Sequence, residues 1–517
     1  MTALFTAAPS FCGRFGVAAL LVVLADFLFY GQPIGITVLL FAMLVAAAVI
    51  ALHPAAFSDA RVWVKPVALL VALLPLAENV SALSVSIALA ALVVFSLSLS
   101  GRLRYGLARI ACQIALFGLA APFRFIRDFI RWRRTVRRFG RRRVRFATIA
   151  VWVMPLTLGA VFLALFGAAN PVIDYWLSLI DLMKLLDLIE LARIAFWLFV
   201  LAGVWAFLRP RLPRFRPRVA GVKHDLANAL PAADPDRRVV EDIVFGRPAI
   251  LRALVVFNVL FALQTGLDAA YLWGGVALPD GLSYAAYAHR GAYPLIVTAL
   301  LAAGFVLAAL RPGSATSADP IIRRLVYAWV AQNIMLVVSS ILRLDLYIGV
   351  YALTYWRIAA FVWMGLVGAG LALIIARIAL GKSNAWLSSA NLLTLSLTLY
   401  ACCFVNFAAT IANYNVDHSF EMTGLGIPVD VVYVHSLGPA AFPALDRLIA
   451  QQSNTAAVGE IPNRQLVAVQ KSDKIRYRAG QQNWRAWSFR DWRLLAYLDR
   501  TGPLMVSDGF QPNLPGR

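Results

Sequence analysis

The sequence has few charged residues and few cysteines. Charged residues make up 14% of its 517 positions, whereas a soluble domain carries roughly a quarter. Apolar residues make up 61%. This composition excludes a disordered chain and an ordinary soluble enzyme. The chain has four cysteines and no C-x-x-C pair, so neither a disulfide scaffold nor a cysteine-based metal site is expected.

The sequence also lacks a recognisable catalytic motif. Gly381-Lys382-Ser383 resembles the end of a phosphate-binding loop, but Ala376 occupies the place of its first glycine. The five histidines form no H-E-x-x-H motif, and Ser436 lacks the flanking glycines of a nucleophile elbow. We therefore expect no enzyme activity, no cofactor and no bound metal.

Long apolar runs recur from about residue 15 to residue 411, and a helix needs roughly 20 apolar residues to cross a bilayer. The sequence predicts an all-α polytopic transmembrane helix bundle of about eleven spans. The expected spans are 15–30, 34–52, 64–77, 80–99, 147–168, 188–208, 251–272, 292–310, 323–342, 356–377 and 389–411. The third is short and contains two prolines, so it is either a crossing span or a re-entrant segment.

The net charge of +22 is concentrated in loops between these spans. Loop 101–146 carries fourteen arginines and a single acidic residue, Asp128, and loop 209–250 carries nine basic and five acidic residues. Basic loops beside membrane spans are typical of the cytoplasmic side. We therefore expect a cytoplasmic N-terminus, an extracytoplasmic C-terminus and no nucleic-acid binding.

These observations divide the chain into six segments. They are the N-terminal membrane spans 1–100, the arginine-rich cytoplasmic loop 101–146, two spans in 147–208, the cytoplasmic linker 209–250, the C-terminal spans 251–411 and the extracytoplasmic tail domain 412–517. Loop 101–146 is either an amphipathic helix on anionic lipid or a solvated run of charge without order. Its lipid-facing arginines would include Arg124, Arg127, Arg131, Arg133 and Arg134.

The tail has the composition of a small α+β domain. We expect a short strand at 431–434, a short helix at 440–450 and an amphipathic helix at 483–498. The last segment contains Trp484, Trp487 and Trp492. These tryptophans either pack the tail onto the membrane or bind a protein partner.

Polar residues within the predicted spans are the most informative positions. A charged side chain in hydrocarbon costs at least about 2.5–3.5 kcal/mol and usually faces the bundle interior or a cavity. The predicted topology places a polar cluster near the outer face, formed by Asp26, Gln264, Asp268, Arg343, Arg357 and Asn406. Within it, Asp268 would pair with Arg343 or Arg357. The alternatives are separate contacts with water at the boundary and a ligand or ion site.

Four spaced motifs occur in the second half of the chain: Gly281–Gly291, Arg343–Arg357, Asn406–Val416 and Trp484–Trp487. Together they resemble an uncharacterised family of bacterial multi-pass inner-membrane proteins, a domain of unknown function. The resemblance implies an inner-membrane location. Beyond the polar cluster, the positions that match its motifs are Tyr284, Tyr287, Tyr347, Thr354, Tyr414 and Asn415. His289 and Ala408 depart from the pattern, at places where an arginine and an acidic residue are expected.

Taken together, these features favour a non-enzymatic envelope scaffold, sensor or accessory protein. The alternative is a transporter or lipid-handling protein that uses the outer polar cluster as its site. In either case the expected partners are the lipid bilayer, anionic lipid headgroups at the cytoplasmic loop and a protein at the extracytoplasmic tail.

Overall fold

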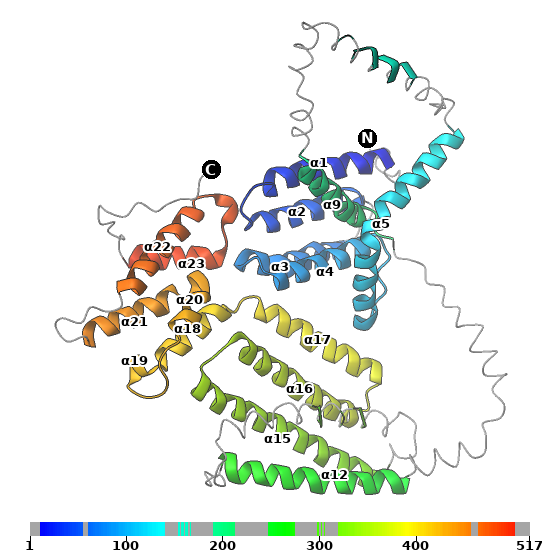
Figure 1. The fold of residues 1–517 in the computed structure, drawn as a ribbon. Helices are drawn as coiled ribbons and strands as arrows, with labels where there is room; N and C mark the ends of the chain where they lie inside the picture. Colours follow the sequence, from blue (N-terminus) through cyan, green and yellow to red (C-terminus); the bar gives the residue numbers. More distant parts are fainter. Residues whose placement is uncertain are drawn as a thin grey trace. The chain divides into compact units, whose positions relative to one another are not determined.

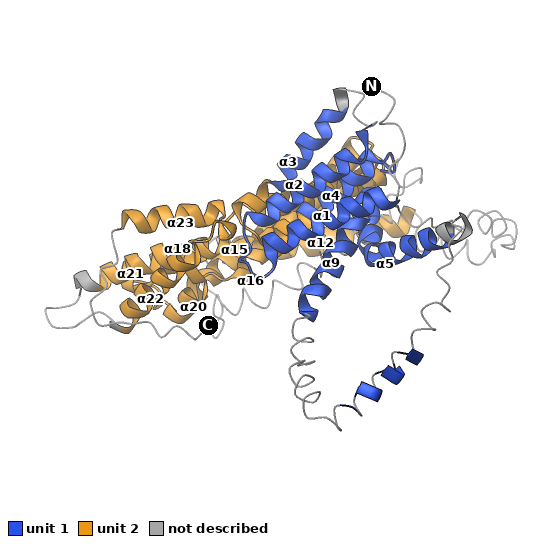
Figure 2. Cartoon of the chain, turned by 90° about the horizontal axis from the view of Figure 1, so that it is seen from above, with its two compact units in different colours: residues 1–73, 88–104, 110–213 blue, residues 74–87, 105–109, 214–517 orange. Residues whose placement is uncertain are grey.

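The computed structural model describes residues 11–54, 60–139, 190–211, 247–273, 319–455 and 464–501, with short pieces between 154 and 166 and between 297 and 305. The chain forms two compact units. Unit 1 comprises residues 1–73, 88–104 and 110–213, and unit 2 comprises residues 74–87, 105–109 and 214–517 (Figure 2).

Unit 1 is built on three packed apolar helices. They are α1 (Phe11–Phe29), α2 (Thr37–Ala51) and α9 (Leu191–Leu208). Arg14 and Asp26 of α1 and Arg193 of α9 are their only charged residues, and the other positions are almost all apolar on every side, as expected for helices surrounded by other helices and by lipid. Trp205 of α9 is fully buried, and its ring lies 5.0 Å from that of Phe11 in α1.

Three further helices follow α2 along the chain. They are α3 (Val64–Glu78), α4 (Ala82–Leu99) and α5 (Leu107–Phe139). Both α3 and α4 are shared between the two units. The loop expected at 101–146 is therefore helical over α5. The alternative of a charge run without order is wrong for these residues, because α5 buries Phe117 against α4 and α9 in an apolar cluster.

Unit 2 contains four membrane-type helices that lie side by side in chain order (Figure 1). They are α12 (Arg247–Asp268), α15 (Pro320–Tyr351), α16 (Tyr355–Ala379) and α17 (Asn384–Cys402). Their shared core contains Trp329.

Aromatic packing holds α12 against α15. The ring of Trp329 lies 5.0 Å from that of Phe257, 5.8 Å from that of Phe261 and 5.5 Å from that of Phe305. Aromatic pairs in these arrangements contribute about 0.5–1.5 kcal/mol each beyond the area that they bury. This cluster therefore forms a tightly packed contact between α12 and α15.

Helix α15 is the longest of the four. Its first turn begins with Pro320, and the Asp319 side chain caps it by accepting hydrogen bonds from the backbone N–H groups of Ile321 and Ile322. With 32 residues at 1.5 Å each it is about 48 Å long, whereas a bilayer core is about 30 Å thick. It is therefore long enough to reach from one membrane boundary to the other.

The last membrane segment is broken. Helix α17 is followed, after a break of four residues, by α18 (Phe407–Asp417), and the two helices meet at 68°. The span expected at 389–411 is thus two helices. The tail continues with α19 (Phe420–Thr423), α20 (Val431–Ser436), α21 (Phe442–Thr455), α22 (Arg464–Gly480) and α23 (Phe489–Arg500).

The described tail residues form helices and no strand, so the α+β expectation is not confirmed. The strand expected at 431–434 is wrong. Asp430 caps α20 by accepting a hydrogen bond from the backbone N–H of Tyr433 at 2.9 Å, and Val434 is buried in the tail core. The helix expected at 440–450 is confirmed as α21. The amphipathic helix expected from 483 begins only at Phe489, where Ser488 caps α23.

Seven described helices are long and apolar enough to cross a membrane, or eight if the bent α17–α18 pair counts as one span. Eleven spans are therefore not confirmed. Helices α2 and α3 have 15 residues each, which is short for a crossing, while the first part of α5 qualifies. The expected spans 147–168 and 292–310 lie largely outside the described residues.

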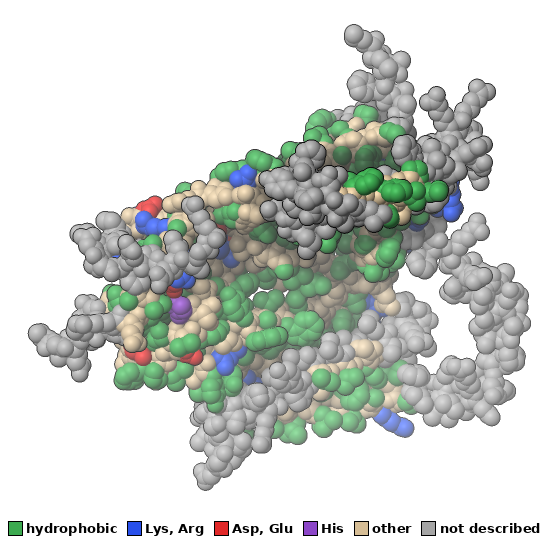
Figure 3. All heavy atoms as spheres, turned by 45° about the horizontal axis from the view of Figure 1, so that its top comes forward, with side chains coloured by type: hydrophobic (Ala, Val, Ile, Leu, Met, Phe, Trp, Pro, Cys, Tyr) green, Lys and Arg blue, Asp and Glu red, His purple; other side chains and the backbone are tan. Residues whose placement is uncertain are grey.

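Large apolar side chains remain exposed on the candidate spans. Leu20, Val23 and Phe27 are exposed on α1, and Val259 and Leu263 are exposed on α12. Figure 3 shows hydrophobic atoms over much of the visible face. A bilayer solvates such surfaces, so the chain is a mainly helical membrane protein.

Candidate functional site

The end of α12 places a carboxylate against an arginine of α15. Asp268 is the last residue of α12, and a five-residue π-helical turn, η3 (Ala269–Trp273), follows it. Arg343 Nη2 donates to Asp268 Oδ1, and Gln264 Nε2 donates to the same oxygen at 3.0 Å. The exposed fractions of the Asp268 and Arg343 side chains are 1% and 4%. Of the two expected partners of Asp268, the structure selects Arg343.

Arg357 lies at the corner between α15 and α16. Its guanidinium donates to the carbonyl oxygens of Tyr351, at 2.5 Å, and of Ala352. Its Cζ also lies 4.8 Å from the centre of the Tyr347 ring. The last carbonyls of a helix have no partner within the helix, so a cation at this place supplies the missing donors.

Asn415 of α18 also holds this corner. Its Nδ2 donates to the carbonyl oxygen of Leu353 at 3.0 Å, and the backbone N–H of Leu353 donates to its Oδ1 at 2.6 Å. Ala352 has a φ of +64°, so the chain turns sharply just before Leu353. Leu353 packs with Ile348 and Ile411 in a buried cluster. A side-chain amide thus satisfies the backbone groups that neither helix can pair.

Other positions that match the family motifs lie around the same corner. Thr354 is the residue that precedes α16, and Tyr414 packs against the apolar cluster of Leu353. Asn406 caps the N-terminus of α18 through its Oδ1. Tyr284 and Tyr287 lie outside the described residues.

Asp26 belongs to unit 1 and has its own partners there. Its Oδ2 accepts from Arg193 Nη2 at 2.6 Å, and its Oδ1 accepts from Trp197 Nε1 at 2.8 Å. The six residues of the expected polar cluster therefore have four separate sets of partners. Arg343 and Gln264 both bond to Asp268, and these three residues form one set. Asp26, Arg357 and Asn406 each have partners of their own.

The arginines expected to face lipid divide into one buried residue and four exposed ones. Arg124 is 2% exposed; its Cζ lies 4.1 Å from the centre of the Phe117 ring, and its Nη1 donates to the carbonyl of Ala206. The expectation that Arg124 faces lipid is therefore wrong, because it shares the buried face of α5 with Asp128 four residues later. The exposed ones are Arg127, Arg131, Arg133 and Arg134.

A second charge group ties the tail to helices that precede it in unit 2. Glu78, the buried last residue of α3, accepts from Arg490 Nε at 3.3 Å and from Arg493 Nη2. Arg490 Nη2 also donates to the carbonyl oxygens of Cys403 and Val405, both at 3.3 Å, in the break between α17 and α18. We call these contacts of Arg490 the tail latch. Sequence patterns offer no signal for it, because Arg490 is one of several arginines on an amphipathic helix.

Ionic contacts also join the tail helices to one another. Asp446 of α21 accepts from Lys474 Nζ of α22 at 2.5 Å and from the Tyr497 hydroxyl of α23 at 2.8 Å. Burial and the Asp446 carboxylate raise the pKa of Tyr497, and burial and Asp491 raise that of Tyr477. Both hydroxyls therefore stay protonated and act as donors across the ordinary pH range.

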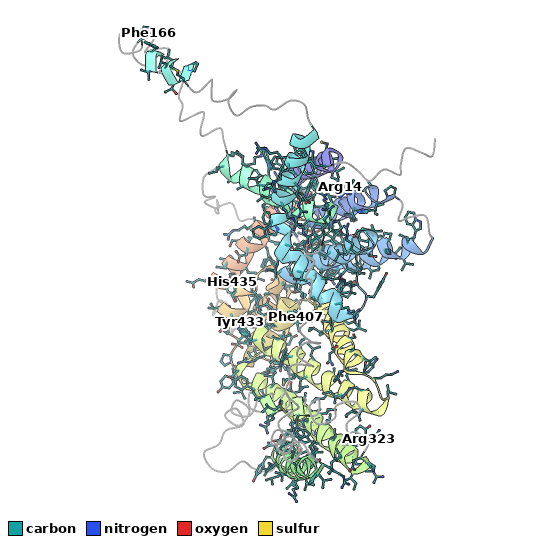
Figure 4. The ribbon with its side chains drawn as sticks, turned by 90° about the vertical axis from the view of Figure 1, so that its right-hand side faces the viewer. Arg14, Phe166, Arg323, Phe407, Tyr433 and His435 are labelled. Carbon is teal, nitrogen blue, oxygen red and sulfur yellow. The ribbon has the colours of Figure 1, made fainter. Side chains whose placement is uncertain are left out.

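The tail also contains a shallow cavity of about 250 Å³. Its lining includes His435, Asp473, Phe442 and Leu445, and Asp473 Oδ2 lies 2.6 Å from His435 Nε2. Figure 4 shows His435 and Tyr433 far from Arg323 near the start of α15. Within the described residues, no group of three His, Cys, Asp or Glu side chains is arranged to hold a metal.

A family model decides where this chain belongs. The model of the domain of unknown function DUF4153 matches residues 66–448, more than half of the chain. The chain belongs to the DUF4153 family. The DUF4153 region contains the Asp268–Arg343 ion pair, the α15–α16 corner and α18, whereas the Trp484–Trp487 motif lies beyond it. No curated protein and no solved structure matches the chain.

The ion pair can be tested by single and double substitution. Asp268→Asn leaves the buried Arg343 charge without its carboxylate, and breaking such a pair costs about 3–5 kcal/mol. We expect a clearly lower Tm in detergent than for the wild type. The double variant Asp268→Leu/Arg343→Met removes both charges and should recover most of the loss. Equal Tm values for Asp268→Asn and the wild type would contradict a buried pair.

The corner can be tested at α18. Asn415→Ala removes both hydrogen bonds to Leu353, and each buried backbone group left unpaired costs about 1–3 kcal/mol. Asn413→Ala on the same helix is the matched control, because the only described residue to which the Asn413 side chain bonds is the exposed Arg447. We expect the Tm of Asn415→Ala to fall well below that of Asn413→Ala, and similar values would show that the amide does not hold the corner.

Proposed function

We propose that this chain is a bacterial inner-membrane protein that works without catalysis, as a scaffold, sensor or accessory protein of the envelope. The positive charge of loops 101–146 and 209–250 supports a cytoplasmic N-terminus and an extracytoplasmic tail. The tail is then the part that meets other envelope components.

The observation that carries this proposal is the tail latch. Arg490 joins α23 both to Glu78 of α3 and to the backbone at the α17–α18 break. Hydrogen bonds to a charged group contribute about 1.5–3 kcal/mol. A tail held in this way is coupled to the broken span. Such coupling is required if the tail is to transmit the binding of a partner to the membrane helices.

The tail also presents an aromatic surface, formed by Trp484, Trp487, Phe489 and Trp492. All four side chains are exposed, and the rings of Phe489 and Trp492 stack at 5.5 Å. Exposed aromatic side chains, and Trp above all, are enriched where proteins bind one another. This surface favours a protein partner for the tail.

A second candidate function is transport or lipid handling. The observation in its favour is the combination of a broken span, α17–α18, with a buried ion pair at the π-helical end of α12. Transporters use discontinuous helices and intramembrane charges in this way. A transporter requires the backbone at the α17–α18 break to open, whereas a scaffold requires only that the tail stays in place.

Native thiols can measure whether the latch holds the break closed. In a Cys12→Ser/Cys112→Ser/Cys402→Ser background, the buried Cys403 is the remaining thiol. Arg490→Ala removes the donor to the Cys403 carbonyl, so we expect labelling of Cys403 by a maleimide to become roughly tenfold faster. The control is Arg500→Ala, an exposed arginine of the same helix. Equal rates in the two variants would mean that the latch is not a restraint.

Photo-cross-linking in cells tests the scaffold proposal. A benzophenone amino acid at Trp492 should form a discrete protein adduct if the aromatic surface binds a partner. The same amino acid at Leu260, an exposed apolar residue of the candidate span α12, is the control and should react with lipid. Lipid adducts alone at both positions would contradict the scaffold proposal and would assign the tryptophans to the membrane surface.

A further inference from the structure

Arginines from separate helix ends gather at one end of unit 1. Arg14 lies in the first turn of α1 (Figure 4), Arg102 follows the end of α4, and Arg209 and Arg211 follow the end of α9. The loops that contain them all belong to the side that the sequence assigns to the cytoplasm. The fold thus brings together cations that are up to 197 positions apart in the chain.

These cations are close enough to repel one another. The charge of Arg14 is opposed by those of Arg209, Arg211 and Arg102, and is supported by the single carboxylate of Asp128. Burial and Arg211 also lower the pKa of Arg209, which Asp128 partly offsets. The single carboxylate of Asp128 therefore neutralises only part of the positive charge of these arginines.

Asp128 positions this group of arginines through its own buried contacts. It is 2% exposed, its Oδ2 lies 3.1 Å from Arg209 Nη1, and the Trp205 Nε1 donates to the same oxygen at 3.4 Å. The Trp205 ring is held by Phe11 at 5.0 Å and by Phe125 at 5.3 Å. Aromatic packing around Trp205 therefore holds Asp128 and Arg209 in place, in addition to the attraction between their charges.

Some of the buried arginine donors have no acceptor among the described residues. They are Nε of Arg14 and both Nε and Nη2 of Arg124, and Arg124 is 2% exposed. A buried charged donor without an acceptor costs free energy that a bound anion would recover. Planar guanidinium groups bind phosphate oxygens in a bidentate manner.

We propose that this end of unit 1 binds the phosphate of an anionic lipid headgroup, with Arg14 and Arg211 as ligands and the Asp128–Arg209 pair as the positioning group. The candidate spans α1 and α9 begin or end at these residues, so the group lies at a membrane boundary. Exposed apolar side chains such as Leu20 and Val23 continue along α1, where acyl chains would lie. Basic pockets between membrane helices on the cytoplasmic side bind such headgroups.

The test uses the full chain, purified in detergent, with phosphatidylglycerol, phosphatidylcholine or inorganic phosphate as the probe. A ligand that binds the folded state raises Tm in proportion to its occupancy. We expect phosphatidylglycerol to raise the Tm of the wild type and phosphatidylcholine not to do so. A rise with inorganic phosphate alone, equal to that with phosphatidylglycerol, would overturn the lipid as the source and leave a free-phosphate site.

The site variant is Arg14→Gln/Arg211→Gln, which leaves the Arg209–Asp128 ion pair intact. Its control is Arg252→Gln/Arg324→Gln, which removes the same charge from exposed positions of α12 and α15. We expect the site variant to bind phosphatidylglycerol about tenfold more weakly and the control to bind like the wild type. Equal weakening in both variants would overturn the proposal, because the attraction would then be diffuse.

A charge-preserving variant covers the case in which the site variant does not fold. Arg14→Lys/Arg211→Lys keeps both cations but loses the planar forks that bind phosphate in a bidentate manner. Its affinity for phosphatidylglycerol should fall between those of the wild type and the site variant. If the lysine variant and the control both bind phosphatidylglycerol as tightly as the wild type, then positive charge alone accounts for the binding. That result would overturn bidentate binding by the two arginines.

Discussion

A charge that leaves water inside a membrane helix bundle needs a partner with matching geometry, and this requirement organises unit 2. Arg343 and Asp268 satisfy it for α15 and α12, with Gln264 as an additional donor. A mismatch at that depth costs several kcal/mol, which is a large share of the stability of a folded protein. The pair therefore fixes the position of α12 along α15. Asp26 and Arg193 satisfy the same requirement between α1 and α9 of unit 1.

The backbone imposes the corresponding requirement wherever a helix stops. Between α15 and α16 the unpaired groups are met by side chains, with Arg357 donating to carbonyls and Asn415 pairing with both groups of Leu353. At the break after α17, Arg490 donates to two carbonyls. Irregular backbone at the level of a membrane is stable only where such partners exist. Several motif positions of the DUF4153 family thus have a structural role at helix ends.

Apolar runs were sufficient to predict α15 and α16, because length and composition alone identify a spanning helix. They were insufficient for α2, which is shorter than the apolar run around it, and for α3, where the run itself is short for a crossing. The valines at 431–434 favour a strand locally, but the Asp430 cap and the burial of Val434 made them helical. Asp268 could be expected to find an arginine nearby. The pairing of Glu78 with Arg490 could not, because residues so far apart in the chain leave no periodic signal.

The length of α15 has a mechanical consequence. It is a single helix of 32 residues whose first turn is tied to α12 by the Arg247–Asp319 ion pair and whose later turns are tied to it by the Asp268–Arg343 pair. The Trp329 ring cluster lies between these two ties along α15. Contacts near both ends and in the middle therefore hold α15 and α12 together over most of their length. A force applied to one end of α15 acts on α12 as well, because the two helices form a single rigid pair.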